Sequence, residues 1–276
     1  MNATPLADLQ RTLYESRNPT RRYLHRRRRE WVRTAIAALP SVATALEVGP
    51  GSGVYLEDLA ARADRVLALD AEPEHLLAAR TSLTDGDAAK RVGFVRADLR
   101  SPPLRSGGID LLLCSEVFEH IPPEVPVLEH LASLLSPAGT LVFTTPQPWS
   151  PVEILGKIAF RQPLLGLLRR IYREPIEPTG HINVVSARAL QPRLETAGLK
   201  IVAYSMLGAY LPLLGEFGGE RAARWLRWLE DRMQHRGLRA LLWTQCYVLQ
   251  KAEGAASFAP ASTLVSSGRH SNPRAE

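Results

Sequence analysis

The chain has few cysteines and no long apolar segment, and a secretory leader is not expected. Its two cysteines, Cys114 and Cys246, both lie in apolar, strand-like stretches. Two such thiols exclude a disulfide framework and are typical of a reducing compartment. Because no run of about 18 apolar residues occurs, we expect no membrane-spanning helix. Residues 1–10 lack the basic and then apolar pattern of a secretory signal, so a cytoplasmic protein is predicted.

Positive charge, by contrast, is abundant and concentrated in one place. The formal net charge is +6. Residues 11–33 contain nine arginines and two glutamates, which sum to +7. Residues 1–10 contribute −1, and the 25 basic and 25 acidic side chains of residues 34–276 cancel. The basic character is therefore one local feature of the chain.

This basic segment is predicted to form a helix. Asn18 and Pro19 are typical of an N-cap and a first helical position, and apolar residues follow at helical spacing as far as Pro40. The run Arg26–Arg29 spans more than one helix face, so part of it must face solvent. Three roles stay open for residues 1–40: a helical cap over a ligand pocket, peripheral attachment to the anionic inner membrane face, or binding of nucleic acid phosphates.

The most informative stretch is ALEVGPGSG at residues 45–53. It reads as an apolar strand with an acid near its end, a glycine turn and then a helix over 54–62. The three glycines let the backbone pass close to a ligand where a Cβ would clash. Glu47 can bind a cationic amino group, whereas a phosphate-binding turn would exclude a carboxylate. The ligand implied is nucleotide-like, with a positively charged end.

Further apolar strands follow at the spacing of an open α/β sheet. The second ends in Asp70, 19 residues after Gly51, where a carboxylate can accept both hydroxyl groups of a ribose. Two more strands run into Asp98 and into Ser115-Glu116. Ligands of such sheets bind at the carboxyl ends of the strands, so these side chains are expected at one edge. Beyond the first strand, we predict strands over 65–69, 92–97, 109–114, 140–144, 200–205 and 242–250.

This order of motifs resembles the class I S-adenosylmethionine (SAM)-dependent methyltransferases, and most of all the branch that includes the quinone-biosynthesis methyltransferases. The motifs that carry it are LEVGPGSG, VLALDAEPEHLLAAR, VGFVRADL, IDLLLCSEVFEHI and LLSPAGTLVFTTP. The resemblance covers about residues 42–205. It implies an α/β, Rossmann-like, doubly wound and mostly parallel seven-stranded sheet, whose last strand is antiparallel, with helical additions. It also implies a methyltransferase domain over residues 41–251.

The resemblance further implies roles for individual residues. The glycine turn and Glu47 would hold the methionine part of SAM, and Asp70 would hold the ribose. Asp98 and the Leu99 backbone would read the adenine, while Ser115 and Glu116 would border the methyl group. The expected cofactor-binding residues are Glu47, Gly49, Gly51, Gly53, Asp70, Ala71, Asp98, Leu99 and Ser115.

Candidate catalytic residues follow the fourth strand. Methyl transfer from a sulfonium mainly needs alignment, with a base where the acceptor carries a proton. His120 and His181 are the candidate bases, with Glu116 beside them. Glu116, Glu119 and His120 form Glu-x-x-Glu-His, and with His181 they could hold Mg²⁺, Mn²⁺ or Zn²⁺, as in a few members of the resembled superfamily. Polar residues that line an active site without a metal are the alternative, and both stay open.

The connection after the fifth strand, residues 147–185, is longer than usual and is the expected substrate lid. Its apolar pieces carry basic residues, which suggests an amphiphilic substrate or contact with a lipid surface. A helical hairpin packed on the sheet is the alternative. Helices are predicted over 186–197, with a kink at Pro192, and over 221–236. Residues 252–276 are expected to be disordered.

We therefore expect a SAM-dependent methyltransferase that acts on an oxygen, or on a nitrogen or carbon, of a small-molecule or lipid-linked acceptor. An RNA methyltransferase that uses the arginine helix is one alternative. An NAD-linked oxidoreductase fits less well, because the turn is GxGxG rather than GxGxxG and Glu47 would face a pyrophosphate. A SAM-binding regulatory protein without catalysis is the non-enzymatic alternative.

Overall fold

One mixed sheet organises the chain. In the computed structural model of the protein, the described residues are 13–16, 19–100, 102–159, 180–211, 218–235 and 237–252. Their seven strands follow the order β3-β2-β1-β4-β5-β7-β6, and only β7 runs antiparallel to its neighbours. The predicted fold class is therefore confirmed. The strands are β1 (Val42–Val48), β2 (Ala63–Asp70), β3 (Val92–Arg96), β4 (Ile109–Ser115), β5 (Leu135–Pro146), β6 (Leu199–Leu207) and β7 (Thr244–Lys251).

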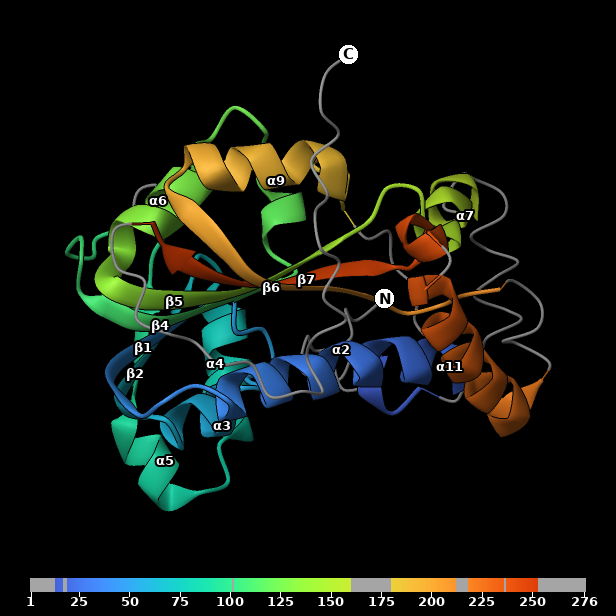
Figure 1. Ribbon diagram of the computed structural model, residues 1–276. Coiled ribbons are helices and arrows are strands. Elements are labelled where there is room, and N and C mark those ends of the chain that lie inside the picture. The colour runs from blue at the N-terminus through green and yellow to red at the C-terminus, as the bar shows by residue number, and fades with distance from the viewer. Residues whose placement is uncertain are drawn as a thin grey trace, which may run out of the picture.

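Helices cover both faces of this sheet (Figure 1). α2, α3, α5 and α11 lie on one side, while α6 and α9 lie on the other. The helices are α2 (Pro19–Ala37), α3 (Leu56–Ala60), α4 (Pro73–Ser82), α5 (Gly86–Arg91), α6 (Val127–Leu134), α7 (Pro151–Ala159), α9 (Ala187–Thr196) and α11 (Gly219–His235), with 3₁₀ turns η1 (Phe118–His120) and η2 (Leu238–Leu241).

The sheet separates two hydrophobic cores. Successive side chains of a strand point to opposite faces, so in β4 Leu111 and Leu113 pack on the α2 side, while Leu112 and Cys114 pack on the α6 and α9 side. Both cysteines of the chain are buried free thiols, as their apolar surroundings predicted. The strands are nearly continuous apolar runs because helices cover both of their faces.

The long helix α2 is part of this packing. It begins at Pro19, as predicted, and ends at Ala37, three residues before Pro40. Its Trp31, Val32 and Ile36 are buried in the same core as the sheet. At its other end, Tyr23 and Leu24 join a third cluster with Leu226 of α11 and with Leu242 and Trp243, which follow η2. Since burying a large apolar side chain contributes about 1.5–3 kcal/mol, this face fixes α2 across the sheet.

Several predicted boundaries were wrong. The helix expected over 54–62 is only α3, because the glycine turn continues through residue 55 before the helix begins. β5 begins at Leu135 instead of Thr140, because Leu135 already pairs with Ile109 of β4, and the register then shifts before Thr140 pairs with Leu111. The first apolar piece of the long connection forms α7, whereas residues 160–179 and the tail from 253 lie outside the described residues. Among the described helices, none is both long enough and apolar enough to cross a bilayer.

The glycine turn gives a stability prediction. Gly53 has φ +73°, and a Cβ there would lie 2.9 Å from both the Cα and the carbonyl oxygen of Ala79. Gly107 has the same φ, but a Cβ there would meet nothing within 4 Å. Gly107→Ala should therefore lower the unfolding free energy by about 1 kcal/mol, which is the cost of holding alanine in the left-handed conformation. Gly53→Ala should cost roughly 2–4 kcal/mol, because a backbone clash of about 1–3 kcal/mol is added.

Urea denaturation of the two variants checks this difference. Equal losses of unfolding free energy would mean that α4 does not lie as close to the turn as the structure places it.

Candidate functional site

Strand ends bring the predicted polar residues to one edge of the sheet. β1, β2 and β4 are neighbours and all parallel, so Glu47, Asp70 and Ser115 lie near adjacent carboxyl ends. The turn after β1 is tied to β2, because the Gly49 amide donates to the Leu69 carbonyl at 2.8 Å. All three glycines of the turn have a left-handed backbone, with φ between 54° and 73°. A side chain at these positions would be strained, which explains the GxGxG spacing.

Glu47 offers an unpaired carboxylate oxygen at this turn. The residue is 2% exposed, and its Oε2 has no hydrogen-bond partner among the described residues. Burial, followed by the nearby charge of Asp58, raises the pKa of Glu47 well above its ordinary value. A buried carboxylate without a partner is costly. A cationic ligand would remove that cost by supplying both the opposite charge and a hydrogen-bond donor.

Asp70 is held in a fixed orientation at the end of β2. Its Oδ2 lies 2.9 Å from Nδ1 of His75, and its Oδ1 accepts from the Glu72 amide at 3.0 Å. The hydrogen bond to Asp70 is the main reason why the pKa of His75 is raised. Each carboxylate oxygen keeps a further lone pair, so the group can still accept two ligand hydroxyls. Ala71 is exposed beside it.

Asp98 and Leu99 follow β3. The hydrogen bonds from Arg100 hold the pKa of Asp98 below its ordinary value. Leu99 is buried, and its carbonyl oxygen lies 3.1 Å from Nδ1 of His130 on α6. The pair therefore presents an ionised carboxylate and a fixed backbone segment next to the Asp70 edge, which is the composition needed to read a nucleobase.

Glu116 forms an ion pair with the arginine helix. Its Oε2 lies 2.8 Å from Nη1 of Arg28, and its Oε1 accepts from the hydroxyls of Thr144 and Thr244 at 3.1 Å each. Arg28 is 6% exposed and lies over the ring of Trp243 at 5.2 Å. Among described non-glycine residues, Glu116 alone has positive φ, +58°, and such strain persists where the surroundings fix it. Ser115 donates to or accepts from Thr144 at 2.9 Å.

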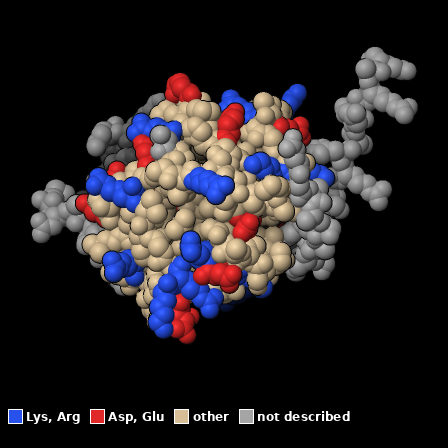
Figure 2. Space-filling model, turned by 90° about the vertical axis from the view of Figure 1, so that its left-hand side faces the viewer, with Lys and Arg blue, Asp and Glu red and all other residues tan. Residues whose placement is uncertain are grey.

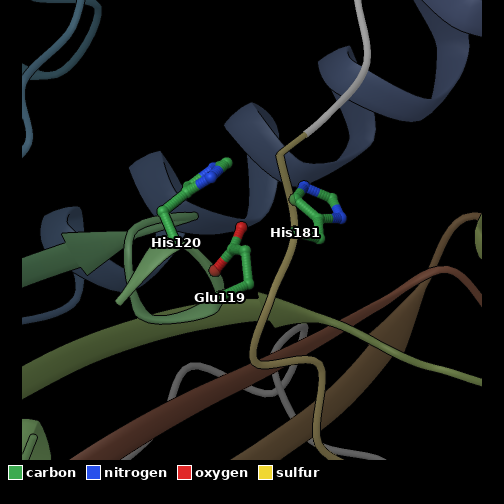
Figure 3. A group of neighbouring side chains, drawn as sticks. All are labelled: Glu119, His120 and His181. Atoms are coloured by element: carbon green, nitrogen blue, oxygen red, sulfur yellow. The ribbon is translucent and has the colours of Figure 1, made fainter. Parts of the chain in front are cut away.

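Glu119, His120 and His181 form a separate cluster (Figure 3). One ligand atom from each lies within 4.8 Å of the others. Glu119 and His120 come from η1, and His181 from a distant segment that is held there because the Ile182 and Asn183 amides donate to the Glu119 carbonyl at 2.9 and 3.0 Å. Of the four residues predicted as a metal set, the structure brings together these three.

The surroundings of His120 favour its neutral imidazole form. Burial, followed by the charge of His181, lowers the pKa of His120. The ring centroids of the two histidines are 5.1 Å apart. Nδ1 of His181 lies 3.0 Å from Oε2 of Glu153 on α7, which leaves Nε2 of that ring for another partner. The Oε1 atom of Glu119 is buried and has no hydrogen-bond partner among the described residues.

Sequence reasoning missed Arg28, His75 and Glu153. A signal existed for Arg28, because it lies four residues after Leu24 and three before Trp31, in phase with the apolar face of α2. His75 and Glu153 gave none, since each acts only through a partner that the fold brings near.

Known proteins that are similar to this chain include methyltransferases. The model of a family described as a methyltransferase domain matches residues 20–204. A ubiquinone biosynthesis O-methyltransferase of Xanthomonas axonopodis pv. citri is 36% identical over 108 residues, which cover 38% of this chain and 44% of that protein. A ubiquinone biosynthesis O-methyltransferase of Bordetella bronchiseptica is 28% identical over 185 residues, which cover 63% of this chain and 71% of that protein. A trans-aconitate 2-methyltransferase of Escherichia coli is 32% identical over 111 residues, which cover 40% of this chain and 41% of that protein.

The match to the Xanthomonas relative thus spans less than half of that protein's length. Among solved structures, a SAM-dependent methyltransferase from Aquifex aeolicus superposes with a TM-score of 0.51 at 16% identity, covering 91% of this chain and all of the other. At that identity the likeness concerns the fold alone.

Proposed function

Because this chain belongs to the methyltransferase-domain family, we propose that it transfers the methyl group of SAM to an oxygen atom of a small or lipid-linked acceptor. The observation that carries the donor half of this proposal is the buried, unpaired Oε2 of Glu47 beside the glycine turn. A carboxylate there fits the ammonium group of a methionine moiety and would repel a pyrophosphate. The family match also favours a transferase over an NAD-linked oxidoreductase.

Each strand end has one task in this proposal. The glycine turn and Glu47 bind the methionine end of SAM, Asp70 accepts the two ribose hydroxyls, and Ala71 borders the ribose. Asp98 and Leu99 contact the adenine. Ser115 and Glu116 border the methyl group. Arg28 is a positioning residue, since its ion pair with Glu116 at 2.8 Å fixes that carboxylate. When bound, SAM supplies a methyl group already activated by its sulfonium, so alignment supplies most of the catalysis.

His120 is the proposed general base. A hydroxyl acceptor must lose its proton to become a good nucleophile, and a neutral imidazole can take it. The lowered pKa of His120 keeps the ring neutral at physiological pH. His181, held by Glu153, would orient the acceptor from the opposite side. With SAM bound, His120 would take the hydroxyl proton while the acceptor oxygen gains the methyl group, and S-adenosylhomocysteine would be the leaving group.

The same cluster also fits a divalent metal ion, and this is the second candidate role. Its donors are a carboxylate and two imidazoles, Glu119 has an unsatisfied buried oxygen, and Glu153 orients His181 as a supporting carboxylate does at metal sites. A metal held by Glu119, His120 and His181 would polarise the acceptor oxygen.

Metal content distinguishes the two roles. If the cluster holds a metal, elemental analysis of purified protein should find close to one equivalent of Mg²⁺, Mn²⁺ or Zn²⁺, and Glu119→Gln should lose it. The matched control is Glu129→Gln, an acid on α6 outside the cluster. Protein that carries no metal and loses no activity with EDTA would leave His120 as the base.

Release of S-adenosylhomocysteine in the presence of an acceptor tests the function. We would use catechol, whose hydroxyl carries a proton, and trans-aconitate, whose carboxylate does not. Transfer to either supports an oxygen acceptor. If SAM binds but no oxygen acceptor, amphiphilic phenols included, releases S-adenosylhomocysteine above the rate without acceptor, oxygen transfer is contradicted.

Residues 147–185 would form a lid over the acceptor, with a helical cap before residue 40 and a tail after 251. The sequence also allowed contact of α2 with a membrane or with RNA. Most of the described α2 arginines instead face protein groups: Arg22 pairs with Glu220, Arg27 with Glu230, Arg28 with Glu116 and Arg33 with Asp58. This pairing leaves few of them to neutralise phosphates.

A further inference from the structure

We propose that the outward face of α11 docks on an anionic lipid surface. This inference rests on the lipid-linked acceptor in the proposed function, because it names the surface from which such an acceptor would be taken. We define the α11 face as Arg221, Arg224, Trp225, Trp228 and Arg232.

The face is continuous and aromatic. Each member has another member three or four residues away, so the five side chains are neighbours on the helix surface. Trp225 and Trp228 are 41% and 48% exposed, although tryptophan is usually largely buried. Their ring centroids are 6.1 Å apart, and Arg232 lies over Trp228 at 4.6 Å. Tryptophan beside arginine on an amphipathic helix is typical of helices that lie in a membrane interface.

The opposite side of α11 is occupied. Ala222 and Leu226 are buried, and Leu226 lies in the cluster that joins α11 to α2 and to Trp243. Glu230 is 1% exposed and accepts from Tyr23, from Arg27 and from the Gly208 amide. The helix is therefore anchored to the protein by one side, and its orientation leaves the two tryptophans outside.

Pairing with α2 is what makes the α11 face positive. Of the three acids in α11, Glu220 pairs with Arg22 and Glu230 with Arg27. The third acid, Asp231, can balance only one of the four arginines of α11, which are Arg221, Arg224, Arg227 and Arg232. No ion pair joins Arg221, Arg224 or Arg232 to another residue that the structure describes. Arginines of α2 thus neutralise two acids of α11. The remaining arginines of α11 give its outward face a positive charge, which complements anionic headgroups.

The face lies near the candidate acceptor site. In Figure 1, α11 and α7 are at the same end of the molecule, and Val152 of α7 packs against the cluster under α11. α7 carries Glu153, which holds His181. Leu238 and Leu241 of η2, which follows α11, are 48% and 41% exposed. The other end, which faces the viewer in Figure 2, has basic and acidic side chains interspersed. Docking through α11 would bring the bilayer next to the acceptor site.

Vesicle co-sedimentation of the full chain tests the proposal. Phosphatidylcholine vesicles are compared with vesicles of phosphatidylcholine and phosphatidylglycerol. The first variant is Arg221→Glu/Arg224→Glu/Arg232→Glu, and the second is Trp225→Ser/Trp228→Ser. The matched control, Arg65→Glu/Arg105→Glu/Lys200→Glu, reverses three exposed charges near the amino ends of β2, β4 and β6. SAM titration in the absence of vesicles shows for each variant whether the fold and the donor site are intact, and this readout is independent of docking.

We expect salt-sensitive binding to the anionic vesicles only. Since each basic residue near such a surface contributes about 1 kcal/mol, the triple arginine variant should bind about 100-fold more weakly or worse. The tryptophan variant should also bind more weakly, and the control should match the unchanged protein. Failure of the unchanged protein to bind, an equal loss in the control, or unaltered binding by the arginine variant would overturn the proposal. So would tight binding of single-stranded RNA that the same arginine substitutions abolish, since the face would then serve nucleic acid.

Discussion

Replacing Asp70 by alanine should lower the affinity of the protein for SAM by about 100-fold to 10,000-fold. In the proposed complex the carboxylate accepts both ribose hydroxyls. Hydrogen bonds to a charged group contribute about 1.5–3 kcal/mol each, so losing two costs roughly 3–6 kcal/mol, and 1.4 kcal/mol is tenfold in affinity. His75 and the Glu72 amide fix the orientation of Asp70 before SAM binds. The Asp70 side chain therefore loses less conformational entropy on binding.

Isothermal titration of SAM measures this loss. The SAM affinity of Asp70→Asn should lie between those of the unchanged protein and of Asp70→Ala, because the amide keeps the shape of the side chain and one acceptor oxygen. Asp64→Ala is the matched control, since Asp64 is an exposed acid at the amino end of the same strand. Unchanged SAM affinity in Asp70→Ala would show that the ribose assignment is wrong.

The second large effect is expected at His120. His120→Ala should lower kcat for catechol by about 100-fold to 10,000-fold, the usual contribution of a positioned general base. The dissociation constant for SAM should stay the same, because His120 is not among the proposed contacts of SAM. With trans-aconitate the loss should be smaller, since an ionised carboxylate needs no base.

His130→Ala is the control for this variant. His130 lies 3.1 Å from the carbonyl oxygen of Leu99, at the proposed adenine end. Its replacement should raise KM for SAM and leave kcat nearly unchanged. If His120→Ala kept the kcat of the unchanged protein with catechol, neither the base nor the metal-ligand role of His120 would survive.

The sequence was most informative where function depends on position along one strand. Glu47, Asp70 and Ser115 could be placed at one edge because parallel strands share their carboxyl ends, and the sheet order agrees. The GxGxG turn could be predicted because glycine adopts the left-handed backbone without strain, and all three alternate glycines of this turn do so.

Contacts between side chains that lie far apart in the sequence could not be predicted, because they depend on which surfaces pack together in the fold. The arginine-rich α2 looked like a free basic surface, but packing of α2 against α11 and the sheet pairs several of its arginines with distant acids. Glu116 fitted a metal set by spacing, yet in the structure it faces Arg28 rather than the histidines. The contact of His181 with Glu153 links two ends of one long connection, and no local pattern specifies such a closure.

Every role proposed at this edge of the sheet depends on binding of SAM by the glycine turn, Glu47 and Asp70. The decisive measurement is calorimetric titration of purified protein with SAM, and separately with NADH. We expect saturable binding of SAM with one site per chain and no heat of binding with NADH. Binding of NADH without binding of SAM would overturn the donor site and every role that follows from it.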